Sequence, residues 1–276
     1  MTESPAAPPG ASRMNLFWEL DDETHSGRGK IRIFEPLLIV PLRYSTRPNS
    51  QPVTPSLEAI DAFPLDSVEA YFRASLRTKL WDNPFRGNGD IWVAYTQTSY
   101  WQAYNRDESS PFRETNYMPE AFSTWRVGLS LGEHWRWQML SIGLKHQSNG
   151  RGSVLGLSRS WNRLYARFGF EGPDTEIYVR PWVRVFSEDP DDNPDIEDFM
   201  GHGDLQVIRH LNDSRLDLTA RINPATGKGM ARLEYHFPLV GDLHVYLSVF
   251  SGYGESLLDY NHRQTTVSAG ISMFQF

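Results

Sequence analysis

The sequence predicts an all-β protein: a twelve-stranded antiparallel transmembrane β-barrel with a polar, plugged lumen. Three observations support this fold class. About twelve segments between Ile31 and Phe276 alternate apolar and polar residues with a period of two, no amphipathic helix of ordinary length interrupts them, and long and short connections alternate between them. No stretch approaches the roughly 18 consecutive apolar residues of a membrane-spanning helix, whereas a barrel strand needs only about ten alternating residues.

The alternation can be followed along the chain, segment by segment. In Val68–Leu80 one face carries Ala70, Phe72, Ala74 and Leu76, and the other carries Glu69, Tyr71, Arg73, Arg77 and Lys79. Met139–Ser148 places Leu140, Ile142 and Leu144 on one face. Thr175–Phe186 does the same with Ile177, Val179, Pro181, Val183 and Val185, and Asp242–Phe250 with Leu243, Val245, Leu247 and Val249. Each segment is therefore expected to be a strand with one apolar face.

The polar faces favour a membrane barrel over a soluble β-fold. They combine charges with large aromatic residues, as in Arg180, Trp182 and Arg184. This mixture indicates an enclosed, hydrogen-bonded lumen, and the apolar face would then contact lipid. A soluble β-fold that binds a ligand remains the alternative at this point.

The domain organisation is simple. Residues 1–29 are expected to be a flexible N-terminal segment, because the start is rich in Pro, Ala and Ser, and residues 30–276 to be the barrel domain. The first residues contain no apolar signal core, so an exported protein would have lost its signal peptide. Loops are expected at Ser45–Phe63, Asn105–Pro111 and Glu188–Asp198.

Composition excludes several classes of function. The chain has no cysteine, which excludes disulfides, thiol catalysis and cysteine metal sites. The net charge is −7 and no basic stripe is present, so a nucleic-acid partner is not expected.

A candidate catalytic set lies where two predicted strands meet. His146 and Ser148 are two residues apart on a strand and therefore share its face, which is the apolar one. On the next strand Asn162 shares the apolar face with Leu164, Ala166 and Phe168. If the strands form a hairpin, the Asn162 amide oxygen can accept a hydrogen bond from His146 Nδ1 and orient the base for a serine nucleophile.

A simpler interpretation of these residues is structural. A His-x-Ser pair is common, polar residues often end a strand, and the run Ser148–Arg151 is typical of a turn. The catalytic interpretation is favoured because three polar residues stand at matching heights on an otherwise apolar face.

Five motifs in order resemble the outer-membrane phospholipase A family. They are His146–Arg151, Ser158–Tyr165, Glu108–Tyr117, Asp191–Ile196 and Ser251–Ser256 followed by Asp259–Asn261. The resemblance extends from about Ile91 to Phe276. It implies a bacterial outer-membrane enzyme that hydrolyses acyl esters of phospholipids and lysophospholipids, with Ser148 as nucleophile, His146 as general base, Asn162 as orienting residue and the Gly150 N–H in the oxyanion hole.

The resemblance also implies a Ca²⁺ cofactor and a homodimer. The implied calcium ligands are the carbonyl of Arg151, the hydroxyl of Ser158 and, from a second subunit, Ser109. Dimerisation with calcium would activate the enzyme. One departure concerns the loop Gly152–Leu157, which is longer than is usual in the family and carries no carboxylate.

Weaker signals leave alternatives open. Gln97 lies on an apolar face and indicates either a bulge or a polar contact across a dimer interface that would include Ala74 and Leu76. The acidic run at 189–195 lacks the glycine and glutamate of an EF-hand. His202, His210, His236 and His244 lack metal-ligand spacing, and Gly252 and Gly254 open no helix. A passive pore or structural barrel is the second functional hypothesis.

Overall fold

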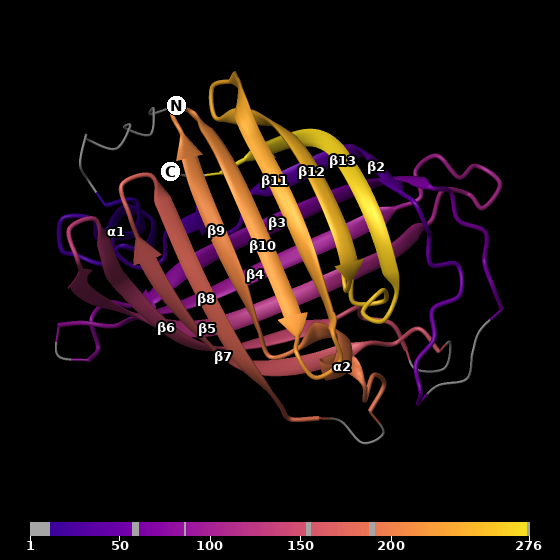
Figure 1. Cartoon of the computed structure of the whole chain (residues 1–276), viewed down its shortest axis with the longest axis horizontal. Helices are drawn as coiled ribbons and strands as arrows, with labels where there is room; N and C mark the ends of the chain where they lie inside the picture. The colour runs from indigo at the N-terminus through magenta and orange to yellow at the C-terminus, as the bar shows by residue number, and fades with distance from the viewer. Residues whose placement is uncertain (1–11, 57–60, 86, 153–155, 188–190, 275–276) are drawn as a thin grey trace.

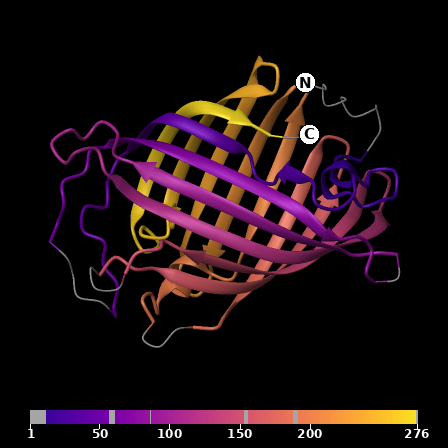
Figure 2. The same cartoon turned by 180° about the vertical axis from the view of Figure 1, so that it is seen from behind.

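The computed structural model describes residues 12–56, 61–85, 87–152, 156–187 and 191–274, and its antiparallel strands form a closed barrel (Figures 1 and 2). Each strand from β2 to β13 pairs with the next along the chain, and β13 returns to pair with β2. The predicted twelve-stranded barrel is confirmed. Its strands are β2 (Leu37–Ser45), β3 (Val68–Trp81), β4 (Asp90–Trp101), β5 (Phe112–Leu131), β6 (Trp135–Ser148), β7 (Ser160–Glu171), β8 (Thr175–Val185), β9 (Gly203–Leu211), β10 (Ser214–Asn223), β11 (Lys228–Val240), β12 (Leu243–Tyr253) and β13 (Arg263–Met273).

A short further strand, β1 (Ile31–Ile33), continues β2 rather than adding a thirteenth position to the wall. Both strands pair with the same side of β3, β1 near Leu76 and β2 near Phe72. Residues 34–36 interrupt the ladder, and Pro36 has no N–H to donate. The Ser75 carbonyl and hydroxyl accept from the N–H groups of residues 34 and 35, both at 3.1 Å, so the interruption leaves these donors satisfied.

The predicted division into an inner and an outer face is confirmed. In β3, Glu69 and Arg73 are 2% and 8% exposed, whereas Leu76 on the other face is 42% exposed. The inner face is filled by ion pairs. Representative ones are Arg43–Glu69 at 2.5 Å, Lys79–Asp90 at 2.6 Å, Arg113–Asp259 at 2.9 Å and Lys145–Glu120 at 3.1 Å. The apolar face consequently forms the outer wall, where a barrel contacts lipid.

The segment before the barrel contains a helix that plugs one end of the lumen. Helix α1 (Arg13–Trp18) begins at Ser12, whose hydroxyl accepts from the Asn15 N–H at 3.0 Å. Trp18 is buried and donates from Nε1 to the Tyr178 hydroxyl at 3.2 Å. The segment expected to be flexible, residues 1–29, thus contains a helix at residues 13–18, and residues 1–11 lie outside the described part. A helix of six residues is too short to show a 3.6-residue period.

The two ends of the barrel differ. Most connections at the end with α1 are tight turns, such as those after β5, β7, β9 and β11, whereas the other end carries the long connections after β2, β4, β6, β8 and β12 (Figure 1). Short turns are typical of the periplasmic end of outer-membrane barrels and long loops of the outer end. The predicted loop Glu188–Asp198 needs one correction, since helix α2 (Ile196–Met200) begins within it and buries Ile196.

No helix among the described residues is long and apolar enough to cross a membrane.

Candidate active site

The side chains of His146 and Asn162 meet on the outer wall. Their residues are direct cross-strand partners in the β6–β7 ladder, and His146 Nδ1 lies 2.8 Å from Asn162 Oδ1. Both are half-buried, as expected at the boundary between an apolar wall and the loops. The hairpin expected from the sequence is thus formed, in the register that brings these two side chains together.

The orientation of the Asn162 amide determines which proton His146 carries. Asn162 Nδ2 donates to the Phe186 carbonyl at 3.1 Å, so Oδ1 is the atom that faces the imidazole. Oδ1 can only accept, and Nδ1 must therefore donate. In a neutral imidazole this leaves Nε2 with its lone pair free, and Nε2 is the nitrogen that can act as a base. Phe186 is the first residue after β8 and has a φ of 53°, so its carbonyl belongs to the loop rather than to the strand.

Ser148 ends strand β6 on the same face as His146. Its cross-strand partners are Tyr117 on β5 and Ser160 on β7. The alternation of β6 directs Ser148 outward, because Gln147 between the two residues is buried in the lumen. Neighbouring outward residues on these strands are apolar, with Leu144 42% and Leu164 46% exposed. The hydroxyl is therefore on the lipid-facing wall near the rim.

A tight turn follows the serine and depends on Gly150. Its φ is +64°, a conformation that L side chains rarely adopt. A Cβ at this position would lie 2.8 Å from the Tyr117 ring. Gly150 is thus required both by the backbone angle and by the close approach of the ring, and its N–H stands two residues after Ser148.

Asn149 closes the base of the loop that holds the predicted calcium ligands. Its Oδ1 accepts from the Arg151 N–H at 3.3 Å and from the Arg159 N–H at 3.1 Å, and its Nδ2 donates to the Leu157 carbonyl at 2.7 Å. One buried side chain therefore brings the neighbourhoods of Arg151 and Ser158 together. Among the described residues, neither the Arg151 carbonyl nor the Ser158 hydroxyl accepts a hydrogen bond.

The oxygen atoms that could bind calcium here are of a suitable type but few in number. Carbonyl and hydroxyl oxygens are ligands that Ca²⁺ accepts. Both are neutral, and the sequence of the loop between them has no carboxylate. The third predicted ligand, Ser109, is exposed in the connection between β4 and β5 at the same end of the barrel. Its φ of 60° puts it in a tight turn in which its N–H donates to the Arg106 carbonyl at 3.1 Å.

Gln97 lies on the outer wall in a regular ladder. It pairs with Ala74 on β3 and Tyr117 on β5, and the register shifts of these ladders lie elsewhere, so the bulge interpretation is wrong. Its Oε1 accepts from the Tyr95 hydroxyl at 3.0 Å and its Nε2 donates to Ser99 at 3.4 Å. These contacts give a polar group on the lipid face partners within one subunit.

The sequence did not predict the buried residues that hydrogen-bond to the backbone beside the site. Asn193 is fully buried, and its Oδ1 accepts from the Ser160 N–H at 2.9 Å, which anchors the start of β7. Arg159 is also fully buried and donates to the Ser158 carbonyl at 2.6 Å. The motif Asp191–Ile196 contains Asn193, but nothing in the sequence indicates that its side chain reaches β7.

The fold and this geometry define a class: an outer-membrane-type barrel with a histidine-based polar set on its lipid-facing wall. Residues 14–273 match the model of the phospholipase A1 family, so the chain belongs to that family. A putative phospholipase A1 of Neisseria meningitidis serogroup B is 38% identical over 265 residues, which cover 94% of this chain and 69% of the relative.

Solved structures agree with this assignment. Outer membrane phospholipase A from Escherichia coli has a TM-score of 0.83 at 33% identity, covering 95% of this chain and 98% of that one. The same protein is also solved as an active-site mutant in which an asparagine is replaced by alanine. The Salmonella typhi outer membrane phospholipase dimer with bound calcium has a TM-score of 0.82 at 32% identity, covering 97% and 98%. The chain is a phospholipase of the bacterial outer membrane.

Proposed function

We propose that Ser148, His146 and Asn162 carry out phospholipid ester hydrolysis on the outer wall of the barrel. The observation that carries this proposal is the pair of hydrogen bonds of Asn162, since they set the histidine tautomer in which Nε2 is the basic nitrogen, and His146 shares its strand face with Ser148. The active-site asparagine of the Escherichia coli relative supports the role of Asn162.

The reaction would proceed through an acyl-enzyme. Ser148 Oγ attacks the ester carbonyl while His146 Nε2 takes its proton, and the imidazolium then gives this proton to the departing glycerol oxygen. Water next attacks the acyl-enzyme, again losing a proton to Nε2, and releases the fatty acid and the free serine. The Gly150 N–H donates to the oxyanion in both steps. Asn162 stabilises the imidazolium by accepting from Nδ1.

Substrate would reach Ser148 from the bilayer. The outer wall around Ser148 is apolar. On the neighbouring strands, Trp101 at the end of β4 stacks on Phe112 at the start of β5, with ring centroids 5.6 Å apart. Acyl chains can lie along such a surface without leaving the hydrocarbon region. This arrangement suits both phospholipids and lysophospholipids, because the site demands one ester near the rim and does not enclose the second chain.

We also propose that calcium and a second subunit complete the site. Arg151 and Ser158 would hold the ion with Ser109 of the partner subunit. The Salmonella typhi relative is a dimer with bound calcium, which supports an ion and a second subunit but names no ligands. Calcium, when bound, would polarise a water toward the oxyanion. Gln97, Ala74 and Leu76 would lie in the homodimer interface, where a partner surface replaces lipid around the polar glutamine.

The deciding experiment measures fatty-acid release from phospholipid in detergent, comparing the unmodified chain with Ser148→Ala. Activity is expected to fall by at least about 10³-fold while the barrel stays folded. Full activity in Ser148→Ala contradicts the proposed nucleophile.

Calcium is tested separately. Excess chelator is expected to silence the enzyme, and Ser158→Ala to raise the calcium concentration required for half-activation. Ser130→Ala, an exposed serine at the other end of the barrel, is the matched control. Persistent activity in excess chelator contradicts the calcium assignment.

A further inference from the structure

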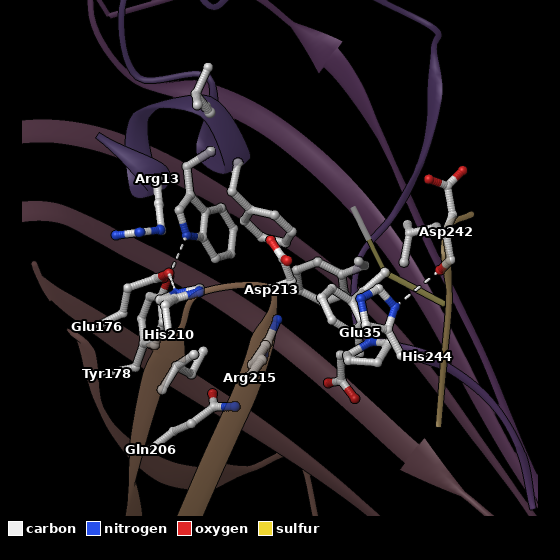
Figure 3. A pocket seen from close by; sticks show the side chains of 18 of the residues that line it. Arg13, Glu35, Glu176, Tyr178, Gln206, His210, Asp213, Arg215, Asp242 and His244 are labelled. Atoms are coloured by element: carbon white, nitrogen blue, oxygen red, sulfur yellow. Dashed lines mark hydrogen bonds and ion pairs between the residues drawn. The ribbon is translucent and has the colours of Figure 1, made fainter. Parts of the chain in front are cut away.

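A cavity of about 510 Å³ lies in the lumen at the end opposite Ser148. Helix α1 covers one side of it, and the exposed turn residues Asp213 and Asp242 stand at its mouth. In Figure 3, Arg13, Glu176 and His210 lie on one side of the space and Glu35 and His244 on the other. The cavity therefore opens at the short-turn end and takes no part in the site on the outer wall.

The cavity wall contains a buried cation that makes no ion pair with the described residues. The Glu120 carboxylate is near enough to interact with it electrostatically, but that carboxylate is held by Lys145 at 3.1 Å and by the Tyr165 hydroxyl at 2.6 Å. Arg167 lines it and is 7% exposed, and its Nη1 is buried with no hydrogen-bond partner. Among the described residues the structure records neither a hydrogen bond nor an ion pair for this side chain. Its recorded contacts are with aromatic faces, 4.9 Å from the Trp18 centroid and 5.5 Å from that of Phe34. Burying a charge without a hydrogen-bonded partner is costly.

The other buried charges of the cavity are paired. Arg180 contacts Asp204 at 2.5 Å, and Arg215 contacts Asp217 at 2.6 Å. Glu176 contacts His210 at 2.7 Å. Arg167 is thus the group in the cavity wall whose charge an incoming anion would neutralise. A buried guanidinium binds a carboxylate strongly, because two N–H groups of the guanidinium match the two carboxylate oxygens.

We propose that this cavity binds a long-chain carboxylate, such as a free fatty acid. The head group would pair with Arg167, and the chain would lie against Trp18, Phe34 and Ile208. Glu35 and Glu176 also line the cavity, and they favour a singly charged head group over a dianionic phosphate. Fatty acid is the product of the family's reaction, so the site would place a product receptor at the periplasmic end, independent of Ser148.

The test is photo-crosslinking of the full chain in non-ionic detergent, in a Ser148→Ala background. The probes are a fatty acid with a diazirine near its methyl end, its neutral methyl ester, and the alkyl phosphate of the same chain length. Peptide mapping is expected to find adducts of the acid on the segments 13–36 and 206–215. The yield there should fall by about tenfold or more in Arg167→Met, as for loss of a hydrogen bond to a charged group.

Arg209→Met is the matched control, because Arg209 is exposed at the same end and pairs with Asp174 at 3.5 Å outside the cavity. The methyl ester and the alkyl phosphate are expected to label these segments weakly. Should Arg167→Met fail to fold, the proposal is tested by comparing labelling by the acid and by the ester in the protein that retains Arg167. Equal labelling by acid and ester, an unchanged yield in folded Arg167→Met, or adducts confined to the outer wall would overturn the proposal.

Discussion

The Asn162 amide makes two hydrogen bonds that together fix its orientation, one to His146 and one to the Phe186 carbonyl. An aspartate in this position would stabilise the imidazolium more strongly. It would also place a charge on the lipid-facing wall, where charge is costly. The neutral amide gives up part of the electrostatic benefit and keeps the correct histidine tautomer.

Replacing Asn162 with alanine tests this role. Asn162→Ala is expected to lower the turnover rate by about 10- to 100-fold, since it removes one hydrogen bond that becomes charge-assisted in the transition state. Fatty-acid release at saturating substrate measures the effect. Leu164→Ala, the next outward residue on β7, should leave the rate within a few-fold, and equal losses in both variants would indicate a structural role instead.

A substitution at Gly150 tests whether the tight turn after Ser148 is needed for activity. Gly150→Ala must adopt a φ near +64° and place a Cβ 2.8 Å from the Tyr117 ring, so activity should fall steeply. Gly152→Ala is the matched control, because none of the described residues lies within 4 Å of its added Cβ. Similar activities of the two variants, measured as fatty-acid release at equal amounts of folded protein, would contradict the importance of the turn.

At the level of single residues, strand parity predicted where the three proposed catalytic residues lie, whereas their roles were inferred from the family resemblance. It placed His146, Ser148 and Asn162 on one face because side chains alternate regularly along a strand. It could not predict Phe186 or Asn149, since their contacts depend on loop backbones and on long-range packing that no local pattern encodes.

Among the elements, the loops at the outer end are tied to the strands by a buried polar cluster. Asp259 in the loop after β12 accepts from Arg113 Nη1 at 2.9 Å, Ser256 Oγ at 2.7 Å and Asn49 Nδ2 at 3.0 Å. The Arg113 carbonyl in turn accepts from Arg151 Nη2 at 2.5 Å, so the cluster reaches the predicted calcium loop. This makes the loop region sensitive to acid.

Burial alone would raise the pKa of the Asp259 carboxyl, but the Arg113 guanidinium and the Ser256 hydroxyl outweigh burial and hold its pKa at about 2. Its unfolded pKa is near 3.8. A lowered folded pKa contributes stability above the unfolded value, and this stability is lost as pH falls from about 4 to about 2. Thermal unfolding followed by circular dichroism in detergent should therefore show a steeper loss in this window for the unmodified chain than for Asp259→Asn. Parallel pH dependences would contradict the linkage.

The elements themselves were predictable to different degrees. Long alternating strands such as β3 and β8 were located to within a residue or so, because their period extends over many residues. Helices α1 and α2 have six and five residues, too few for a helical period, and both were missed. The interruption between β1 and β2 was also missed, since it depends on the contacts of Ser75 across the ladder.

The whole molecule combines a largely filled lumen with the proposed active site on the outer wall. Buried ion pairs and the aromatic residues around Trp18 fill the interior between the cavity at the short-turn end and the long loops, so the lumen is closed along this stretch. A closed barrel removes free strand edges, and its rigid ladder holds residues from neighbouring strands in fixed register. The predicted polar lumen follows from the same alternation that places the proposed catalytic residues on the outer wall.

The filled lumen predicts that the reconstituted protein gives no stable conductance steps in planar bilayers under conditions in which it hydrolyses phospholipid. A general porin in the same bilayers serves as the positive control. Steady channel openings by the active, folded protein would contradict the filled lumen and support the hypothesis of a pore.

The most direct test of the central claim is covalent labelling with a long-chain alkylsulfonyl fluoride, in which a serine oxygen displaces fluoride. Peptide mass mapping is predicted to find a single sulfonyl adduct on Ser148, formed in step with loss of activity and greatly slowed in His146→Asn. Complete inactivation with no adduct on Ser148, or labelling that proceeds equally well in His146→Asn, would contradict a histidine-activated serine on the outer wall.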